Sequence, residues 1–447
     1  MKKYGVYNIP IRLFILIGFV IHAVVFVYAC YEVNLYYGWP LSDATDYLRL
    51  AENLRVHGLM YCGDLNEPFL PALVSRRPPF YGLFITMLRF ISSSPYLILA
   101  AQNLLGLLNV WLMLLCVRKI TGVKQFPWWL LVILWFPSQY ILANVIMSEV
   151  FFQTWLIWGL YHGICFLKTS STRHLVIWQL LIVAAMLTKP IMYLFVIPMM
   201  VLLAVMIWKK KVRPVVMVVI LIPLSGIISL SAYNFKQTGY FHFSSIQNFN
   251  LLNYNTAYTL REALGPDPAD SVMNELHNRL DTIPDFATRE RATQRICTAN
   301  LYRYKWTYLR MEVQGIIKFF IDPGRWDLYD FMGMRPQNDH GMAWHFRREG
   351  VSGWWRYVSS FPLLVWMYMI ITYAVNFWII FGLMRFTRAT DISPWIRVCL
   401  VTVTLYFASI TGPLASGRFR VPVYPVIACM VLSGYVSRMK PKQLNAL

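Results

Sequence analysis

Ten apolar stretches, separated by short basic connectors or by polar segments, constrain this chain more than any other feature of its sequence. A stretch of about 20 apolar residues crosses the hydrocarbon core of a bilayer as an α-helix. The sequence therefore predicts an α-helical integral membrane protein with about ten transmembrane helices. They are placed near residues 11–31, 96–117, 126–144, 149–167, 174–188, 191–208, 214–233, 361–384, 395–412 and 420–437.

The distribution of charge agrees with this interpretation. The formal net charge is +20, but six of the 21 acidic residues lie in 32–94 and thirteen in 234–360, where five and fifteen basic residues nearly balance them. The basic surplus lies in the connectors, which is the positive-inside pattern of membrane proteins and not the footprint of a nucleic-acid-binding protein. Those connectors hold Lys2, Lys3, Arg12, Arg118, Lys119, Lys124, Lys168, Arg173, Lys209, Lys210, Lys211, Arg213, Arg385, Arg388, Arg397, Arg438, Lys440 and Lys442.

Ten crossings place both termini in the cytoplasm and both polar segments outside, with the first span retained rather than cleaved as a signal peptide. We expect three regions in the chain. Residues 1–233 form an N-terminal transmembrane region whose first external loop is 32–94. Residues 234–360 form a mostly helical external segment, and residues 361–447 form a C-terminal transmembrane region.

Two interfacial helices are expected in the first external loop, over residues 44–55 and 79–91. The apolar run 78–91 is too short to cross a bilayer, and a crossing there would invert the charge pattern of every later connector. The proline pair Pro78-Pro79 is suited to start a helix that lies along the interface instead.

Three carboxylates on the external side could take part in the chemistry, and Asp43 and Glu149 are the candidate catalytic groups. Asp43 and Asp46 are three residues apart, so a helix places them on one face. Glu149 is the single acidic residue between positions 95 and 261. Such groups could deprotonate an acceptor hydroxyl or bind a divalent cation, and the metal is left open. The alternatives are an N-cap role for Asp43 or Asp46 and a helix-dipole role for Glu149.

Cations at the same face complete the pattern. Lys189, Arg418 and Arg420 are predicted to be external, against the positive-inside trend, where they suit an anionic lipid phosphate. Arg76 and Arg77, in the first loop, could contact phosphate or only lipid headgroups. The alternative for each cation is ordinary snorkelling of its side chain toward headgroups.

Taken in order along the chain, these motifs resemble those of the GT-C membrane glycosyltransferases, in the superfamily of protein O-mannosyltransferases and lipid A aminoarabinose transferases. The resemblance covers residues 11–437 and is weakest through 256–360. The motifs are Asp43-x-x-x-Tyr47-x-x-x-Ala51-x-Asn53-Leu54, Arg77-Pro78-Pro79-Phe80-Tyr81, Ser148-Glu149-Val150-Phe151, Thr188-Lys189-Pro190, Tyr233-Asn234-Phe235 and Gly417-Arg418-Phe419-Arg420-Val421-Pro422.

The resemblance implies a fold and an activity. Asp43 matches the family's catalytic aspartate, and Glu149 matches a second acidic position. The implied reaction transfers a monosaccharide, with inversion, from a polyprenyl-phosphate donor to a glycan, lipid or protein on the external face of a membrane, by this reading the bacterial cytoplasmic membrane. The implied partners are that donor, an acceptor left open and the bilayer. Substrate binding falls to Asp46, Tyr47, Arg76, Arg77, Tyr81, Lys189, Arg418 and Arg420.

Three other functions compete with this one. A transporter or flippase for a lipid-linked sugar would show repeated halves and ionisable residues at mid-membrane, and neither is visible in the sequence. An O-antigen polymerase or ligase would share the long external loops but not the carboxylates of the first loop. A structural membrane subunit would have no reason to gather acids and bases on one face.

Overall fold

The computed structural model describes residues 8–36, 42–334 and 341–437, and its regular structure is almost entirely helical, as the apolar stretches predict. Strands β1 (Asn8–Pro10) and β2 (Gln125–Pro127) form one short antiparallel pair. The first half of the chain contains α1 (Ile11–Tyr36), α2 (Ser42–His57), α3 (Pro79–Arg89), α4 (Pro95–Thr121), α5 (Pro137–Ala143), α6 (Glu149–Thr169), α7 (Thr172–Met186), α8 (Val196–Trp208) and α9 (Leu221–Thr238).

The second half is also built from helices, several of them short. Between α10 and α11 the chain forms a π-helical turn, Leu251–Thr256. The helices are α10 (Ile246–Asn250), α11 (Ala257–Leu264), α12 (Pro266–Asp281), α13 (Phe286–Arg303), α14 (Lys305–Ile321), α15 (Arg325–Phe331), α16 (Met342–Ser359), α17 (Leu363–Thr387), α18 (Pro394–Ile410), α19 (Gly417–Arg420) and α20 (Tyr424–Ser437).

Within the described residues, seven helical segments are long and apolar enough to cross a membrane. Two shorter apolar helices, α7 and α18, stand where the sequence predicted two further crossings. The chain is therefore an α-helical membrane protein. The seven segments are Ile11–Tyr31, Pro95–Thr121, Glu149–Thr169, Pro190–Trp208, Pro214–Thr238, Leu363–Thr387 and Gly417–Ser437.

The predicted span over residues 126–144 is not a continuous helix. A 3₁₀ segment, Trp128–Leu134, is followed by two extended residues and then by α5. Pro137 causes the break, because a proline donates no backbone hydrogen bond and pushes the preceding residue out of the helical region. Phe136 accordingly has φ −141° and ψ 82°.

Helix α20 forms the centre of the transmembrane bundle. It packs against α4, α6, α17 and α18, and nearly its whole length is buried. Its contact with α17 is close because Gly434 carries no side chain: a Cβ there would lie 2.6 Å from the backbone nitrogen of Phe386. Small residues permit this close approach of backbones in membrane proteins. Helices α1 and α17 instead leave many apolar side chains exposed, as lipid-facing helices do.

The first polar loop folds as the two predicted helices. Helix α3 begins at the Pro78-Pro79 pair and lies against α2, with Thr86 Oγ1 donating to the carbonyl of Ala51 at 3.1 Å. The backbone nitrogen of Phe80 donates to the carbonyl of Leu187 at 2.9 Å. This bond ties the start of α3 to the chain just after α7, so the loop is held against the bundle.

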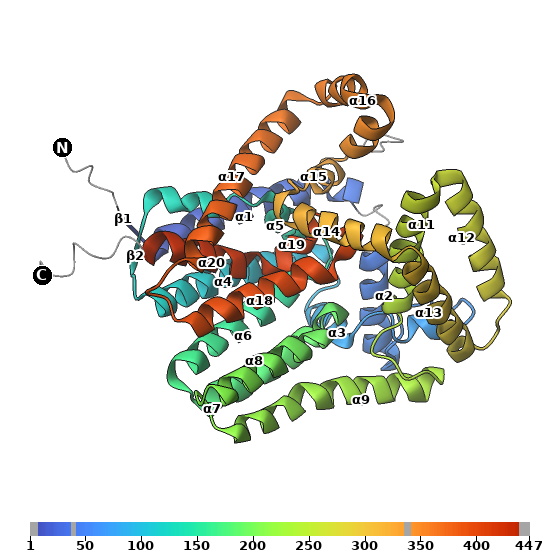
Figure 1. The fold of residues 1–447 in the computed structure, drawn as a ribbon, viewed down its shortest axis with the longest axis horizontal. Helices are drawn as coiled ribbons and strands as arrows, with labels where there is room; N and C mark the ends of the chain where they lie inside the picture. The colour runs from blue at the N-terminus through green and yellow to red at the C-terminus, as the bar shows by residue number, and fades with distance from the viewer. Residues whose placement is uncertain (1–7, 37–41, 335–340, 438–447) are drawn as a thin grey trace, which may run out of the picture.

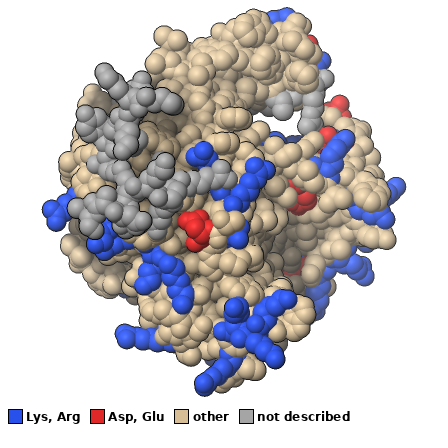
Figure 2. Space-filling view, turned by 60° about the vertical axis from the view of Figure 1, so that its left-hand side comes forward, with Lys and Arg blue, Asp and Glu red and all other residues tan. Residues whose placement is uncertain are grey.

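Figure 1 shows how the molecule is arranged along its length. The β1–β2 pair lies at the left, and α11, α12 and α13 lie at the right, with α2 and α3 between them and the bundle. The left-hand end comes forward in Figure 2, where basic side chains are many and acidic ones few. Lys168 Nζ donates to the carbonyl of Lys119, so two basic connectors meet. The basic end and the α11–α13 end are thus opposite.

Candidate active site

Asp43 lies in the first turn of α2 and accepts bonds from two arginines that are distant in sequence. Arg77 donates through Nη2 to Oδ1, and Arg418 donates through Nη2 to Oδ2 at 2.5 Å. The two guanidinium groups come from the segment before α3 and from α19. Asp43 is thus the point where the first loop meets the last transmembrane segment.

Asp46 lies one helical turn further along α2 and shares a partner with Asp43, as the three-residue spacing predicts. Arg77 Nε donates to Asp46 Oδ2 at 3.0 Å, and Arg76 Nε lies 3.0 Å from the same oxygen. Adjacent arginines therefore bracket one carboxylate, and both are less than a quarter exposed.

Glu149 forms the second half of the cluster. It starts α6, where a carboxylate is favoured by the helix dipole, and its side chain is 1% exposed. Oε1 accepts from Lys189 Nζ at 2.8 Å and from Arg418 Nε at 2.9 Å. Arg418 therefore bridges Glu149 and Asp43 with two different nitrogens, which is the fork geometry that arginine supplies and lysine does not.

The backbone around Gly417 explains how Arg418 reaches this position. A Cβ on Gly417 would lie 2.9 Å from the Cα of Gly324 and 3.2 Å from Oγ of Ser138. Gly324 itself has φ 72°, the left-handed conformation that glycine adopts readily. Two glycines thus let α19 pass close to the turn before α15, which aims Arg418 at the carboxylates.

Tyr47 and Tyr81 are buried aromatic residues beside the charged groups. Tyr47 is buried and donates to Ser148 Oγ at 2.9 Å, next to Glu149, while the Arg77 guanidinium lies 5.2 Å from its ring centroid. Burial raises the pKa of Tyr47 to about 12, so the phenol stays protonated and donates. Tyr81 packs edge-on against Tyr47 and donates to Gln102. Tyr81 therefore packs against Tyr47, and within the described residues it forms no hydrogen bond with the three carboxylates.

Asp43 stays ionised in this setting. Burial would raise the pKa of Asp43, but the Arg77 and Arg418 guanidinium groups outweigh it and hold that pKa well below its usual range. Burial lowers the pKa of the Lys189 amine, while the Glu149 carboxylate acts in the opposite direction.

The cluster carries more positive than negative charge. Four cations, Arg76, Arg77, Lys189 and Arg418, face three carboxylates, Asp43, Asp46 and Glu149, which leaves a surplus of one positive charge. Among residues 8–36, 42–334 and 341–437, no three His, Cys, Asp or Glu side chains are placed to hold a metal ion together. A divalent cation does not fit here, because guanidinium and ammonium groups already occupy the positions between the carboxylates.

Arg420 is not brought to the cluster. Its side chain is buried, donates to the carbonyl of Asp322 at 3.1 Å and to that of Phe320, and lies 4.7 Å from the ring centroid of Phe136. These contacts join α19 to the end of α14, so Arg420 fixes the position of α19, the helix that carries Arg418.

The sequence reasoning did not single out Asp327. It lies on α15 behind Arg418, and its Oδ2 accepts from Ser138 Oγ at 2.9 Å. Burial raises the pKa of Asp327 to about 7, the Ser138 bond opposes that rise, and Asp322 adds to it. The one signal in the sequence is the turn Asp322-Pro323-Gly324 just before it, which does not indicate that Asp327 is buried.

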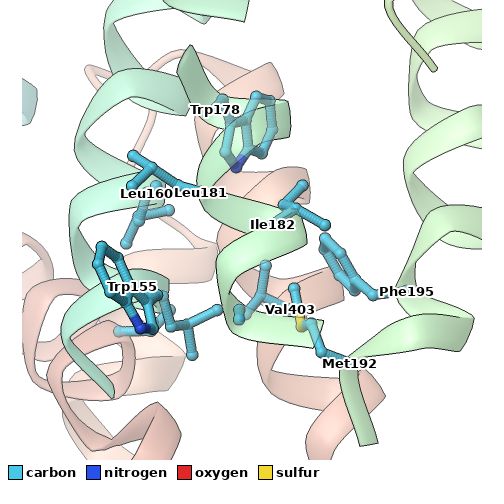
Figure 3. A pocket seen from close by; sticks show the side chains of 12 residues that line it. Trp155, Leu160, Trp178, Leu181, Ile182, Met192, Phe195 and Val403 are labelled. Atoms are coloured by element: carbon cyan, nitrogen blue, oxygen red, sulfur yellow. The ribbon is translucent and has the colours of Figure 1, made fainter. Parts of the chain in front are cut away.

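A narrow apolar cleft of about 10 Å³ lies between α6, α7, α18 and the 3₁₀ segment Pro190–Phe195, which begins directly after Lys189. Figure 3 shows Trp155 and Trp178 on one side of this cleft and Met192 and Phe195 on the other. Lys189 therefore belongs to the charged cluster and directly precedes the segment that lines this apolar cleft.

Comparisons with known proteins give limited similarity. No protein-family model matches the chain, and no curated protein matches it. Solved structures of ArnT from Cupriavidus metallidurans do match. The form bound to undecaprenyl phosphate is 12% identical over 96% of this chain and 77% of that one, with a TM-score of 0.36. The apo form is 13% identical over 89% and 73%, with a TM-score of 0.32.

TM-scores this low carry no weight for function, which is therefore argued from the residues of this chain.

Proposed function

We propose that this protein is a membrane glycosyltransferase that transfers a monosaccharide from a polyprenyl-phosphate donor to an acceptor hydroxyl. The observation that carries the proposal is the bridging position of Arg418 between Asp43 and Glu149, inside a cluster with a surplus positive charge. Such a site suits a ligand that brings both a phosphate and a hydroxyl, because the cations bind the first and a carboxylate binds the second.

The cations of the cluster suit the donor's phosphate, which takes the place nearest Lys189 and Arg418. The donor's isoprenoid chain extends toward the bilayer, because the cavity lined by Trp155, Trp178 and Phe195 is only about 10 Å³ and cannot hold it. The reacting groups are then positioned before the chemical step, which supplies a large share of catalysis.

The proposed reaction is a single displacement. Asp43 accepts the proton of the acceptor hydroxyl, the hydroxyl oxygen bonds to the anomeric carbon, and the carbon–oxygen bond to phosphate breaks. The phosphate departs with the bonding electrons, and Lys189 and Arg418 stabilise its charge. Inversion at the anomeric carbon follows from one attack from the side opposite the leaving group.

Donor binding also prepares Asp43 for this task. While Arg418 is bonded to Asp43, that carboxylate is a weak base, because its pKa is held low by two guanidinium groups. A phosphate that competes for the Arg418 fork releases Asp43 Oδ2. Asp43 is thus a stronger base when the donor is bound than when the donor is absent.

Glu149 keeps one oxygen available for substrate. Within the described residues, Oε2 of Glu149 is buried and accepts no hydrogen bond. Buried polar atoms in proteins are nearly always paired, so an orphan acceptor marks a place where a ligand donates. A hydroxyl of the donor sugar supplies that donor in the proposed complex.

The test uses purified protein in lipid nanodiscs and a panel of radiolabelled polyprenyl-phosphate monosaccharides. Wild type is expected to bind polyprenyl phosphate and to release or transfer sugar from a member of the panel, while the uncharged polyprenol binds more weakly. Arg418→Met is expected to bind the phosphate at least about tenfold more weakly, a loss of about 1.4 kcal/mol. Arg388→Met, which alters an exposed connector, is the matched control. Equal affinity for phosphate and polyprenol would contradict the proposal.

A further inference from the structure

A second cavity adjoins the candidate active site and is not used by the proposed donor. It has a volume of about 160 Å³ and lies between the first loop and a wall made by α10, the π-helical turn Leu251–Thr256, α12 and α13. Pockets for drug-sized ligands measure about 300–1,000 Å³, so this one has room for one small unit and not for a lipid.

The walls of the cavity are tied to the first loop by hydrogen bonds. Ser244 Oγ donates to the carbonyl of Arg76 at 3.0 Å, and Ser245 Oγ donates to that of Ala72 at 2.6 Å. The backbone nitrogen of Ser245 also donates to the carbonyl of Ser75 at 3.2 Å. Three hydrogen bonds therefore hold the two walls of the cavity together.

Its lining is rich in paired donors and acceptors. Asn253 Oδ1 lies 3.0 Å from Nε2 of His277, and Asn248 Nδ2 donates to Glu290 Oε2 at 2.8 Å. Phe249 adds a partly exposed aromatic ring, whose centroid lies 4.9 Å from the Arg76 guanidinium. An aromatic face beside planar amides and a carboxylate matches the alternating apolar faces and hydroxyl edges of a sugar ring.

The charges of the lining cancel, in contrast to those of the neighbouring cluster. Arg76 and Arg289 are balanced by Asp281 and Glu290. Arg76 is in addition paired with Asp46. A phosphorylated ligand gains little from a wall without net charge, whereas a neutral ligand with many hydroxyl groups can use each donor and acceptor.

Arg76 connects the cavity to the reacting groups. It forms part of the cavity wall and pairs with Asp46, which shares Arg77 with Asp43. A ligand in the cavity therefore lies next to the Arg76–Asp46 pair of the cluster, whereas Glu149 and Lys189 pair with each other.

We propose that this cavity binds the acceptor, and that the acceptor is a neutral, polyhydroxylated carbohydrate and not a phosphorylated one. The proposal rests on the proposed glycosyltransferase function and names its acceptor class. In it, the donor's phosphate lies beside Lys189, the acceptor enters from the side of α10, α12 and α13, and their reacting atoms meet at Asp43.

Two measurements on full-length protein in nanodiscs test the proposal. The first is transfer from the polyprenyl-phosphate sugar to a panel of neutral methyl glycosides, with glucose 6-phosphate as the anionic probe. The second is saturation-transfer NMR of the same methyl glycosides without donor. The variants are His277→Ala and Asn253→Ala, with Asn274→Ala, on the exposed face of α12, as the matched control.

The expected result separates acceptor from donor. Each pocket variant raises the KM for the methyl glycoside about tenfold and weakens its NMR signal, while binding of polyprenyl phosphate and hydrolysis of the donor by water stay at the wild-type level. The control variant behaves as wild type. Glucose 6-phosphate is used more poorly than its neutral counterpart.

The failures of the two proposals are distinguishable. Transfer by wild type together with an unchanged acceptor KM in both pocket variants would overturn the cavity's role, as would a preference for glucose 6-phosphate. If no donor is turned over, but the NMR signal falls in the pocket variants alone, the carbohydrate site stands and the glycosyltransferase function fails. Absence of any NMR signal and of any transfer overturns both.

Discussion

Arg418 and Arg420 are two residues apart on one four-residue helix, yet they bind different partners. Successive residues of an α-helix are rotated by about 100°, so positions two apart point to nearly opposite sides. Arg418 meets Asp43 and Glu149, whereas Arg420 meets backbone carbonyls at the end of α14. The sequence predicted that both would lie near the lipid phosphate. A short motif does not reveal in which direction each side chain of its helix points, so the two arginines could not be told apart.

Asp327 provides a test at the residue scale that depends on pH. Its folded-state pKa of about 7 lies above the ordinary value of 3.8 because the side chain is buried. Between those values the folded protein holds a proton that the unfolded chain has lost, so this group makes the folded state progressively less stable as pH rises, up to about pH 7.

Asp327→Asn is therefore expected to melt a few degrees higher than wild type above pH 7, because the amide accepts the Ser138 hydrogen bond without carrying a charge. The advantage should shrink as pH falls and vanish near pH 4. Melting curves from pH 4 to 9 in one detergent measure it, with Asp391→Asn in the exposed connector between α17 and α18 as control. A constant difference at all pH values would contradict the assignment.

The elements are positioned by close backbone contacts as much as by apolar faces. Gly434 on α20 meets Gly382 and Phe386 of α17, where an added Cβ would lie 2.6–2.7 Å from backbone atoms. Neither helix can shift easily, because α20 is surrounded on its other sides by α4, α6 and α18.

Gly434→Ala is expected to destabilise the protein by about 1–3 kcal/mol, the usual cost of overpacking a filled core. Gly18→Ala on α1 is the matched control, since a Cβ there meets one side chain at 3.8 Å, an ordinary contact. Thermal unfolding of both variants in the same detergent measures the difference. Equal melting temperatures for the two variants would show that α17 and α20 are not in tight contact.

At the level of elements, much of the fold could be predicted from the sequence. Apolar length predicted most of the long apolar helices, and α3 is an eleven-residue helix, too short to cross a bilayer, as expected. The prediction of one continuous helix over 126–144 was wrong because an average of hydropathy does not register Pro137. The proline nitrogen donates no backbone hydrogen bond, so the helix is interrupted there. Asp327 was missed because α15 has only seven residues, too few for a periodicity that indicates which side is buried.

The molecule as a whole has two chemically different ends. The β1–β2 pair and many basic side chains lie at one end, and α2, α3 and α11–α13 lie toward the other. The sequence predicts that the first end is cytoplasmic and the second external, by the positive-inside rule.

This orientation can be measured by labelling single cysteines in intact cells with a membrane-impermeant maleimide. Asn278→Cys, on α12, is expected to react at once, and Lys210→Cys, in a basic connector, only after the membrane is permeabilised. The native cysteines are buried or half-buried, so wild type gives the background. The opposite pattern of labelling would place the proposed site in the cytoplasm.

The central claim is that Asp43 acts on an acceptor hydroxyl, and the most direct measurement compares turnover by wild type and Asp43→Asn with the same polyprenyl-phosphate sugar. Glu67→Gln, on the exposed turn of the same loop, is the control. Removal of a positioned general base typically costs about 10²–10⁴ in rate, so Asp43→Asn should lose turnover by that factor while polyprenyl phosphate still binds. Turnover by Asp43→Asn near the wild-type rate would contradict the account.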